Sequence, residues 1–112
     1  MEEQIYRDIN ELLDVLPDII KDFRRNSTNP AYKKMQNIMP QINRIYISLL
    51  EHKAEYEKLG VELPRDIIMA QLNNMADGFE YRDSIKLGDT LEYEIINTLS
   101  LYKELIEEKG MQ

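Results

Sequence analysis

The sequence predicts an all-α fold: an antiparallel four-helix up-down bundle with a shorter third helix and Pro-kinked first and second helices. Three observations support this. Apolar residues recur every three or four positions in four separate blocks, Gly and Pro occur only four times each, and no segment alternates with the period of two typical of a strand. A chain of 112 residues has room for a single such domain, spanning residues 1–112.

The first two helices are predicted over about residues 2–25 and 30–59. Asn29 followed by Pro30 is a start signal for the second helix, and Gly60 is suited to end it in a left-handed conformation. Steps of three and four residues place the apolar side chains on one face of each helix. These stripes are Ile5, Ile9, Leu12, Leu16, Ile19 and Phe23 in the first helix, and Met35, Ile38, Ile42, Ile45, Leu49 and Tyr56 in the second.

The last two helices are predicted over about residues 64–80 and 84–109. Pro64 opens the shorter third helix, Asp83 is a plausible N-cap for the fourth, and Gly110 ends it. Their stripes are Ile67, Ile68, Leu72, Met75 and Phe79, and then Leu87, Leu91, Ile95, Leu99, Tyr102 and Leu105.

Two prolines lie inside the predicted first and second helices. Each removes a backbone hydrogen bond, so we expect a kink at both positions. Pro17 precedes Thr28 by 11 residues and Pro40 follows it by 12, which places both at the same height about the turn. The paired kinks either form a shared bend around the core or widen a groove between the two helices.

The charge of the chain limits its partners. The net charge is −7, distributed as −3 over residues 1–26, +2 over 27–60 and −6 over 61–112. This acidity argues against binding to nucleic acid or to anionic membranes. No segment is apolar enough to span a membrane, and Met1 runs directly into acidic sequence, so we expect a cytoplasmic protein.

Catalytic chemistry has little support in the sequence. Cysteine is absent, and His52 is the only histidine, without a recognisable triad or Glu-x-x-His pattern around it. No glycine-rich phosphate loop or EF-hand is present. We therefore assign no catalytic residue, no cofactor and no metal ligand.

The most distinctive segment contains Gly88, a residue that costs a helix about 1 kcal/mol relative to Ala. Asp89 and Glu92 follow it, and Glu92 borders the apolar stripe, where a carboxylate needs a cationic partner. Arg44 and Lys53 on the more basic second helix are the expected partners. The group is interpreted either as a structural polar clamp or as a site for a partner or ligand.

The same segment carries a resemblance. Leu-Gly-Asp-Thr-Leu-Glu-Tyr-Glu, residues 87–94, is similar to the C-terminal motif of small uncharacterised helical domains in Firmicutes, some of them near motility or cell-surface genes. The likeness covers about a dozen residues. It implies a cytoplasmic helical bundle with no assigned catalytic residues.

Two functions from different classes remain as hypotheses. The first is a non-catalytic protein-interaction module, such as an adaptor or a small chaperone, whose surplus apolar surface binds a protein partner or forms a homodimer. The alternative is a carboxylate-rich bundle that binds a divalent metal or a small ligand, including a metal-dependent enzyme. The candidate partner-binding residues are Met39, Tyr46, Ile47, Leu50, Tyr93 and Leu101.

Overall fold

The computed structural model describes residues 2–26 and 28–110, and within these residues it contains helices and no strands. The all-α class expected from the sequence is therefore confirmed. The helices are α1 (Glu2–Arg24), α2 (Thr28–Glu51), α3 (Lys53–Glu57), α4 (Arg65–Glu80), α5 (Ser84–Thr90), the π-helical segment η1 (Leu91–Ile95) and α6 (Ile96–Glu108).

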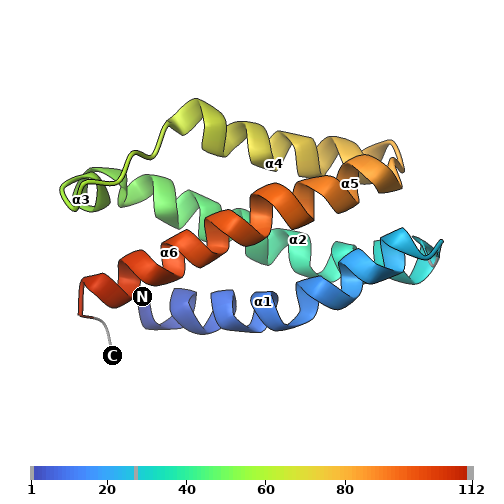
Figure 1. Cartoon of the computed structure of the whole chain (residues 1–112), viewed down its shortest axis with the longest axis horizontal. Helices are drawn as coiled ribbons and strands as arrows, with labels where there is room; N and C mark the ends of the chain where they lie inside the picture. The colour runs from blue at the N-terminus through green and yellow to red at the C-terminus, as the bar shows by residue number, and fades with distance from the viewer. Residues whose placement is uncertain (1, 27, 111–112) are drawn as a thin grey trace.

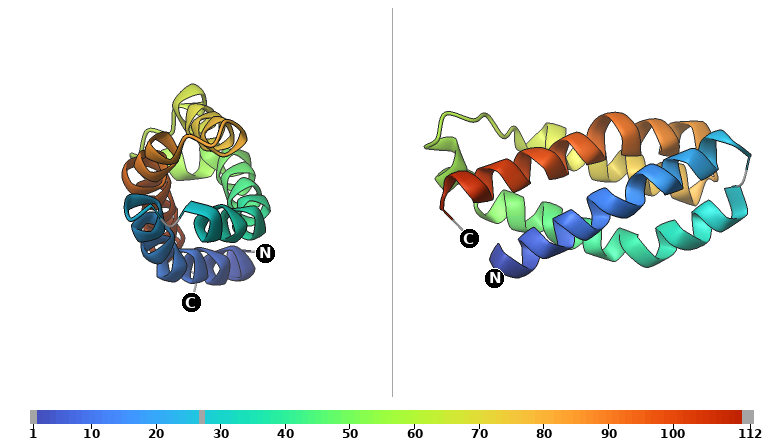
Figure 2. Two further views of the ribbon diagram at one scale, coloured as in Figure 1. Left: turned by 90° about the vertical axis from the view of Figure 1, so that its right-hand side faces the viewer. Right: turned by 60° about the horizontal axis from the view of Figure 1, so that its bottom comes forward.

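The molecule measures 42 × 28 × 18 Å along its three principal axes. The long helices lie side by side along the longest of these axes (Figure 1). α1 and α2 are connected by a short turn, α4 runs back past α2, and α5, η1 and α6 form one run that returns along α1. The α1–α2 and α4–α5 turns lie at one end of the molecule, and α3 lies at the other (Figures 1 and 2).

The core lies between these helices and is built mainly from Leu, Ile and Tyr side chains. Nearly all of the predicted stripe residues are buried or pack against it. Ile67 is an exception with 59% of its surface exposed, because Ile68 takes the buried position beside it on α4. The buried Tyr46 has a polar partner, since its hydroxyl donates to Gln71 Oε1 at 2.6 Å.

The second predicted helix differs from the observed structure at both ends. α2 begins at Thr28, two residues before the predicted start, and the helix breaks at His52, which has φ −101° and ψ 11°. The His52 Nδ1 atom lies 2.8 Å from the Ser48 carbonyl oxygen at this break. The apolar pattern did not reveal the interruption because Tyr56, beyond it in α3, is still buried. Gly60 has the expected left-handed conformation, with φ 90°.

The fourth predicted helix contains a π-helical segment that periodicity did not predict. Asp83 is its N-cap as expected, since Asp83 Oδ1 accepts a hydrogen bond from the Lys86 backbone N–H at 3.0 Å. η1 then covers Leu91–Ile95, inside the distinctive segment, before α6 continues the helix. Around η1 the stripe residues Leu87, Leu91, Ile95 and Leu99 follow one another at steps of four, a step that α-helices also use, so the pattern was interpreted as an ordinary helix.

Pro17 and Pro40 both lie inside continuous helices, within α1 and α2 respectively.

Among the residues that the structure describes, no helix is both long and apolar enough to cross a bilayer.

Candidate functional site

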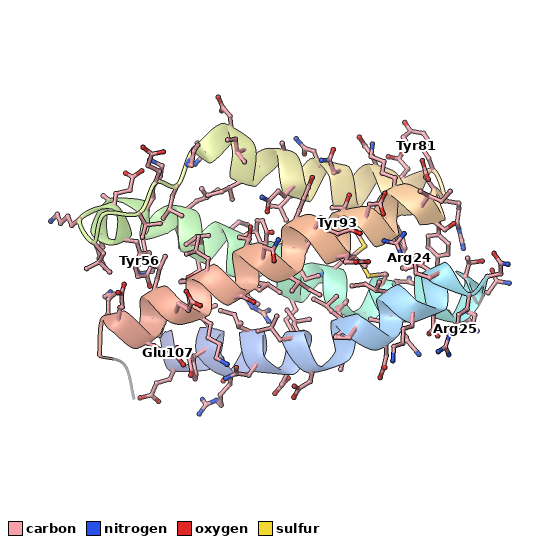
Figure 3. All side chains as sticks on the ribbon, in the orientation of Figure 1. Arg24, Arg25, Tyr56, Tyr81, Tyr93 and Glu107 are labelled. Carbon is pink, nitrogen blue, oxygen red and sulfur yellow. The ribbon has the colours of Figure 1, made fainter. Side chains whose placement is uncertain are left out.

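The distinctive segment forms a clamp around an arginine. Arg24, the last residue of α1, places its Nη2 atom 2.8 Å from Asp89 Oδ1 and 2.9 Å from Glu92 Oε1. Figure 3 shows Arg24 close to the part of the chain that carries Tyr93. Hydrogen bonds from the guanidinium to Glu92 and then to Asp89 raise the pKa of Arg24, so this cation keeps its charge.

Gly88 makes room for this arginine. It is buried, and a Cβ atom built on it would lie 3.1 Å from Arg24 Nη1 and 3.2 Å from Arg24 Cζ. Any side chain at this position would meet the guanidinium. The unusual glycine and the two carboxylates therefore serve one arrangement, in which α1 is tied to the α5–η1 run.

The partners of the clamp differ from those expected. Arg44 Nη2 instead lies 3.5 Å from Asp8 Oδ2, and Lys53 Nζ donates to Glu57 at 2.8 Å. The expectation relied on the positive charge of the second helix, whereas α5 packs against α1 and α4. Because one cation is shared by two carboxylates of the same chain, the geometry favours the structural interpretation of the clamp.

The six candidate partner-binding residues do not share one surface. Tyr46 is fully buried, so its assignment as a surface residue was wrong. Ile47 and Tyr93 are exposed, at 53% and 62%, but they line different pockets. Three more are half-buried and pack against the core: Met39, Leu50 and Leu101.

Ile47 lines a groove of about 600 Å³ between the first half of α1 and the second half of α2, which we call the α1/α2 groove. Its wall contains Asp8, a carboxylate only 5% exposed, which accepts hydrogen bonds from Gln4 Nε2 at 2.9 Å and Arg44 Nη2 at 3.5 Å. The residues that line it are Gln4, Ile5, Asp8, Pro40, Asn43, Arg44, Ile47, Ser48, Glu51 and His52.

The α2 side of this groove carries an ordered set of charges. Arg44 and Glu51 stand seven residues apart, with Ile47 between them, and all three line the groove. The Arg44 side chain is 62% exposed despite its contact with Asp8, so its positive charge faces solvent as well. The α2 side of the groove therefore presents an apolar residue flanked by one cation and one anion, with Asp8 on the α1 side.

The comparison with known families decides the classification. The family described as a domain of unknown function, DUF8042, matches residues 1–105. The chain belongs to the DUF8042 family. The matched region runs from α1 into α6 and so contains both the arginine clamp and the α1/α2 groove of this DUF8042 domain. The chain matches no curated protein and no solved structure.

Apart from the buried Asp8, the described carboxylates lie at the surface of the DUF8042 domain. Within residues 2–26 and 28–110, no group of three or more His, Cys, Asp or Glu side chains is arranged to hold a metal ion. Some carboxylates are engaged by lysines near α3: Glu55 accepts from Lys109 and Glu57 from Lys53, each at 2.8 Å. The hydrogen bond from the lysine lowers the pKa of both glutamates.

Proposed function

We propose that this DUF8042 domain is a non-catalytic protein-interaction module, and that its α1/α2 groove is the contact surface between two copies of the chain. The observation that carries the proposal is the self-complementary face of α2. Arg44, Ile47 and Glu51 follow one another at steps of three and four residues, so they occupy one side of the helix.

A two-fold axis crossing α2 near residues 47 and 48 would bring two such faces together in antiparallel orientation. Arg44 of one copy then stands opposite Glu51 of the partner subunit, and the reverse pair forms by symmetry. The two Ile47 side chains meet near the axis, beside the apolar part of the groove. Two Arg44–Glu51 ion pairs and one contact between the Ile47 side chains thus form without any other molecule.

The groove beside Ile47 provides contact area beyond that of the exposed isoleucine itself. Burying an exposed Ile contributes at most about 1.5–3 kcal/mol, so one isoleucine alone does not hold a dimer. Ile47 lies against a groove with a mostly apolar wall, where a second copy gains further contact area. The two Arg44–Glu51 pairs offset part of the repulsion between two chains of net charge −7.

The test is sedimentation equilibrium of the full chain over a concentration series. We expect a monomer–dimer equilibrium that Ile47→Asp weakens at least about tenfold, because a carboxylate would be buried at the axis. Ile67→Asp is the matched control, since Ile67 on α4 is 59% exposed and does not line the groove. Equal effects of the two substitutions would contradict the proposal.

The charge pattern has its own test. Glu51→Arg places two arginines opposite each other in the proposed dimer, so we expect it to weaken association, whereas Glu62→Arg outside the groove changes only the net charge. A wild-type chain that stays monomeric up to about 1 mM would overturn the homodimer. Binding of a different protein in the same groove would then identify another occupant.

We further infer that α1, α2, α4 and the α5–η1–α6 run form an up-and-down four-helix bundle in which Pro17 and Pro40 bend α1 and α2. Successive runs reverse direction along the long axis, which supports the bundle (Figure 1).

Pro17 and Pro40 each leave one backbone carbonyl without its helical hydrogen-bond donor, at Leu13 and Gln36 respectively. Because Pro40 lines the groove, Pro40→Ala should raise stability and weaken dimer formation; unchanged association would contradict the bend's role.

A further inference from the structure

Among the described residues, the buried hydroxyl of a tyrosine near the α1–α2 turn has no hydrogen-bond partner. Tyr32 is 5% exposed and packs edge-on against Phe23 and Phe79, with ring centroids 5.1 and 5.8 Å away. Its hydroxyl makes no hydrogen bond within the described part of the chain. A buried polar group without a partner costs about 1–3 kcal/mol and is rare in native proteins. A ligand atom that accepts a hydrogen bond from the Tyr32 hydroxyl would remove this cost.

An arginine in a strained conformation covers this tyrosine. Arg82 follows α4 with φ 54°, a left-handed value that glycine or asparagine usually adopts at a helix end. Its guanidinium carbon lies 4.4 Å from the centre of the Tyr32 ring. Because glycine would adopt this backbone conformation with less strain, the arginine here points to a role for its guanidinium.

The two residues line a pocket of about 250 Å³ between α2 and the α4–α5 turn. Its lining contains two cations and no carboxylate, in a chain whose net charge is −7. Four larger pockets of the described residues each include at least one Asp or Glu. The lining residues are Asn29, Tyr32, Lys33, Gln36, Phe79 and Arg82.

The two cations that line this pocket have positive charges that no described carboxylate pairs with. Lys33 and Arg82 form no ion pair with any described residue, whereas the adjacent Lys34 pairs with Asp22 at 2.9 Å. The nearby Asp83 caps α5 through the Lys86 N–H and does not line the pocket. The first turn of α2 carries no acidic residue of its own that would neutralise the positive end of the helix dipole.

We propose that this pocket binds a phosphate group of a small ligand, or free phosphate. Lys33 and Arg82 neutralise its charge, the Tyr32 hydroxyl donates to one oxygen, and the start of α2 adds favourable dipole. On binding, the exposed Arg82 guanidinium turns from the Tyr32 ring toward the anion, and the hydroxyl that is buried in the unliganded chain becomes accessible to it. This site lies at the end of the molecule away from α3 and does not depend on the dimer proposed above.

The experiment measures thermal unfolding and NMR titration of the full chain with inorganic phosphate and with glycerol phosphate, against chloride at equal ionic strength. Binding raises the melting temperature by linkage and shifts the amide signals of residues 29–36 and 82. The probe that binds more tightly identifies the source of the phosphate group. Absence of both effects with both probes overturns the proposal.

Four variants separate binding from folding. Arg82→Gly removes the guanidinium while suiting the left-handed backbone, so we expect unchanged or higher stability and about tenfold weaker phosphate binding. Lys33→Gln should weaken binding similarly, and Tyr32→Phe should weaken it while the unliganded chain stays folded. Lys34→Gln is the matched control and should keep wild-type binding. Equal binding by Lys33→Gln and Lys34→Gln contradicts the site.

Discussion

The guanidinium of Arg24 occupies the space that a side chain on Gly88 would take, with Nη1 3.1 Å from the Cβ position. The arginine comes from the end of α1 and the glycine from the middle of α5. Gly is disfavoured in a helix by about 1 kcal/mol relative to Ala. This unfavourable residue stands where the Arg24 side chain of α1 occupies the space that a larger residue would fill. The complementarity of these two residues can be measured directly.

The first prediction is a double-mutant cycle between these two positions. In an Arg24→Ala background, Gly88→Ala should stabilise the chain by about 1 kcal/mol, because nothing obstructs the new methyl group. In the wild-type background the gain should be smaller, since the guanidinium must move and its contacts with Asp89 and Glu92 weaken. We expect a coupling of about 0.5 kcal/mol or more, measured by urea denaturation. Additive effects would show that Arg24 does not need the space at Gly88.

The second prediction concerns Gly78, where the obstruction is rigid. A Cβ there would lie 3.0 Å from the Cβ, 3.1 Å from the Cα and 3.2 Å from the backbone N of Leu87. α4 and α5 would have to separate, so Gly78→Ala should destabilise the chain by about 1–3 kcal/mol despite its better helix propensity. Its unfolding midpoint compared with that of Gly88→Ala checks this. Stabilisation by both substitutions would refute the close packing of the two helices.

The clamp illustrates which parts of a site a sequence can reveal. The cost of Gly88 and the position of Glu92 beside the apolar stripe were sufficient to predict a polar clamp in this segment. Arg24 was not predicted as the cation of the clamp. The apolar periodicity indicates which face of a helix is buried, but it does not indicate which other helix packs against that face. Arg24 follows the stripe residue Phe23 at the end of α1 and is itself exposed, so no local signal marked it.

The same reasoning explains the error at Tyr46. One apolar stripe per helix was assumed, and Tyr46 lies outside the central stripe of α2. In the structure α2 packs against both α1 and α4, so a wider face is buried. Tyr46 reaches Gln71 of α4, and Thr98 of α6 donates to the same oxygen at 2.7 Å. The three helical segments around Tyr46 come together only in the folded chain.

The third prediction contrasts Tyr46 with its neighbour Ile47. Tyr46→Lys should unfold the chain or cost it more than about 4 kcal/mol, because an ammonium group would replace a fully buried phenol. Ile47→Lys should change monomer stability by less than about 0.5 kcal/mol, since Ile47 is 53% exposed. Circular dichroism with urea titration at low protein concentration measures both. A folded Tyr46→Lys variant would contradict the burial of this side chain.

The fourth prediction is a loss of stability in alkaline solution. Burial raises the pKa of Tyr46 well above the value near 10 that it has in the unfolded chain, and the neighbouring Thr98 hydroxyl opposes this shift only in part. The unfolded chain therefore releases a proton that the folded chain retains. The contribution of Tyr46 is full below about pH 10 and falls at higher pH, by up to about 1.4 kcal/mol per pH unit.

Tyr46→Phe tests this dependence. The variant should lose about 1 kcal/mol near pH 8, where the hydrogen bond to Gln71 is missing, and its stability should then fall less steeply above pH 10 than that of the wild type. Some alkaline loss remains, because burial also raises the pKa of Tyr32. Tyr81→Phe, at a side chain that is 73% exposed, is the control and should follow the wild-type curve. If Tyr46→Phe and wild type fall in parallel between pH 8 and about pH 11.5, ionisation of Tyr46 does not limit the alkaline stability of the fold.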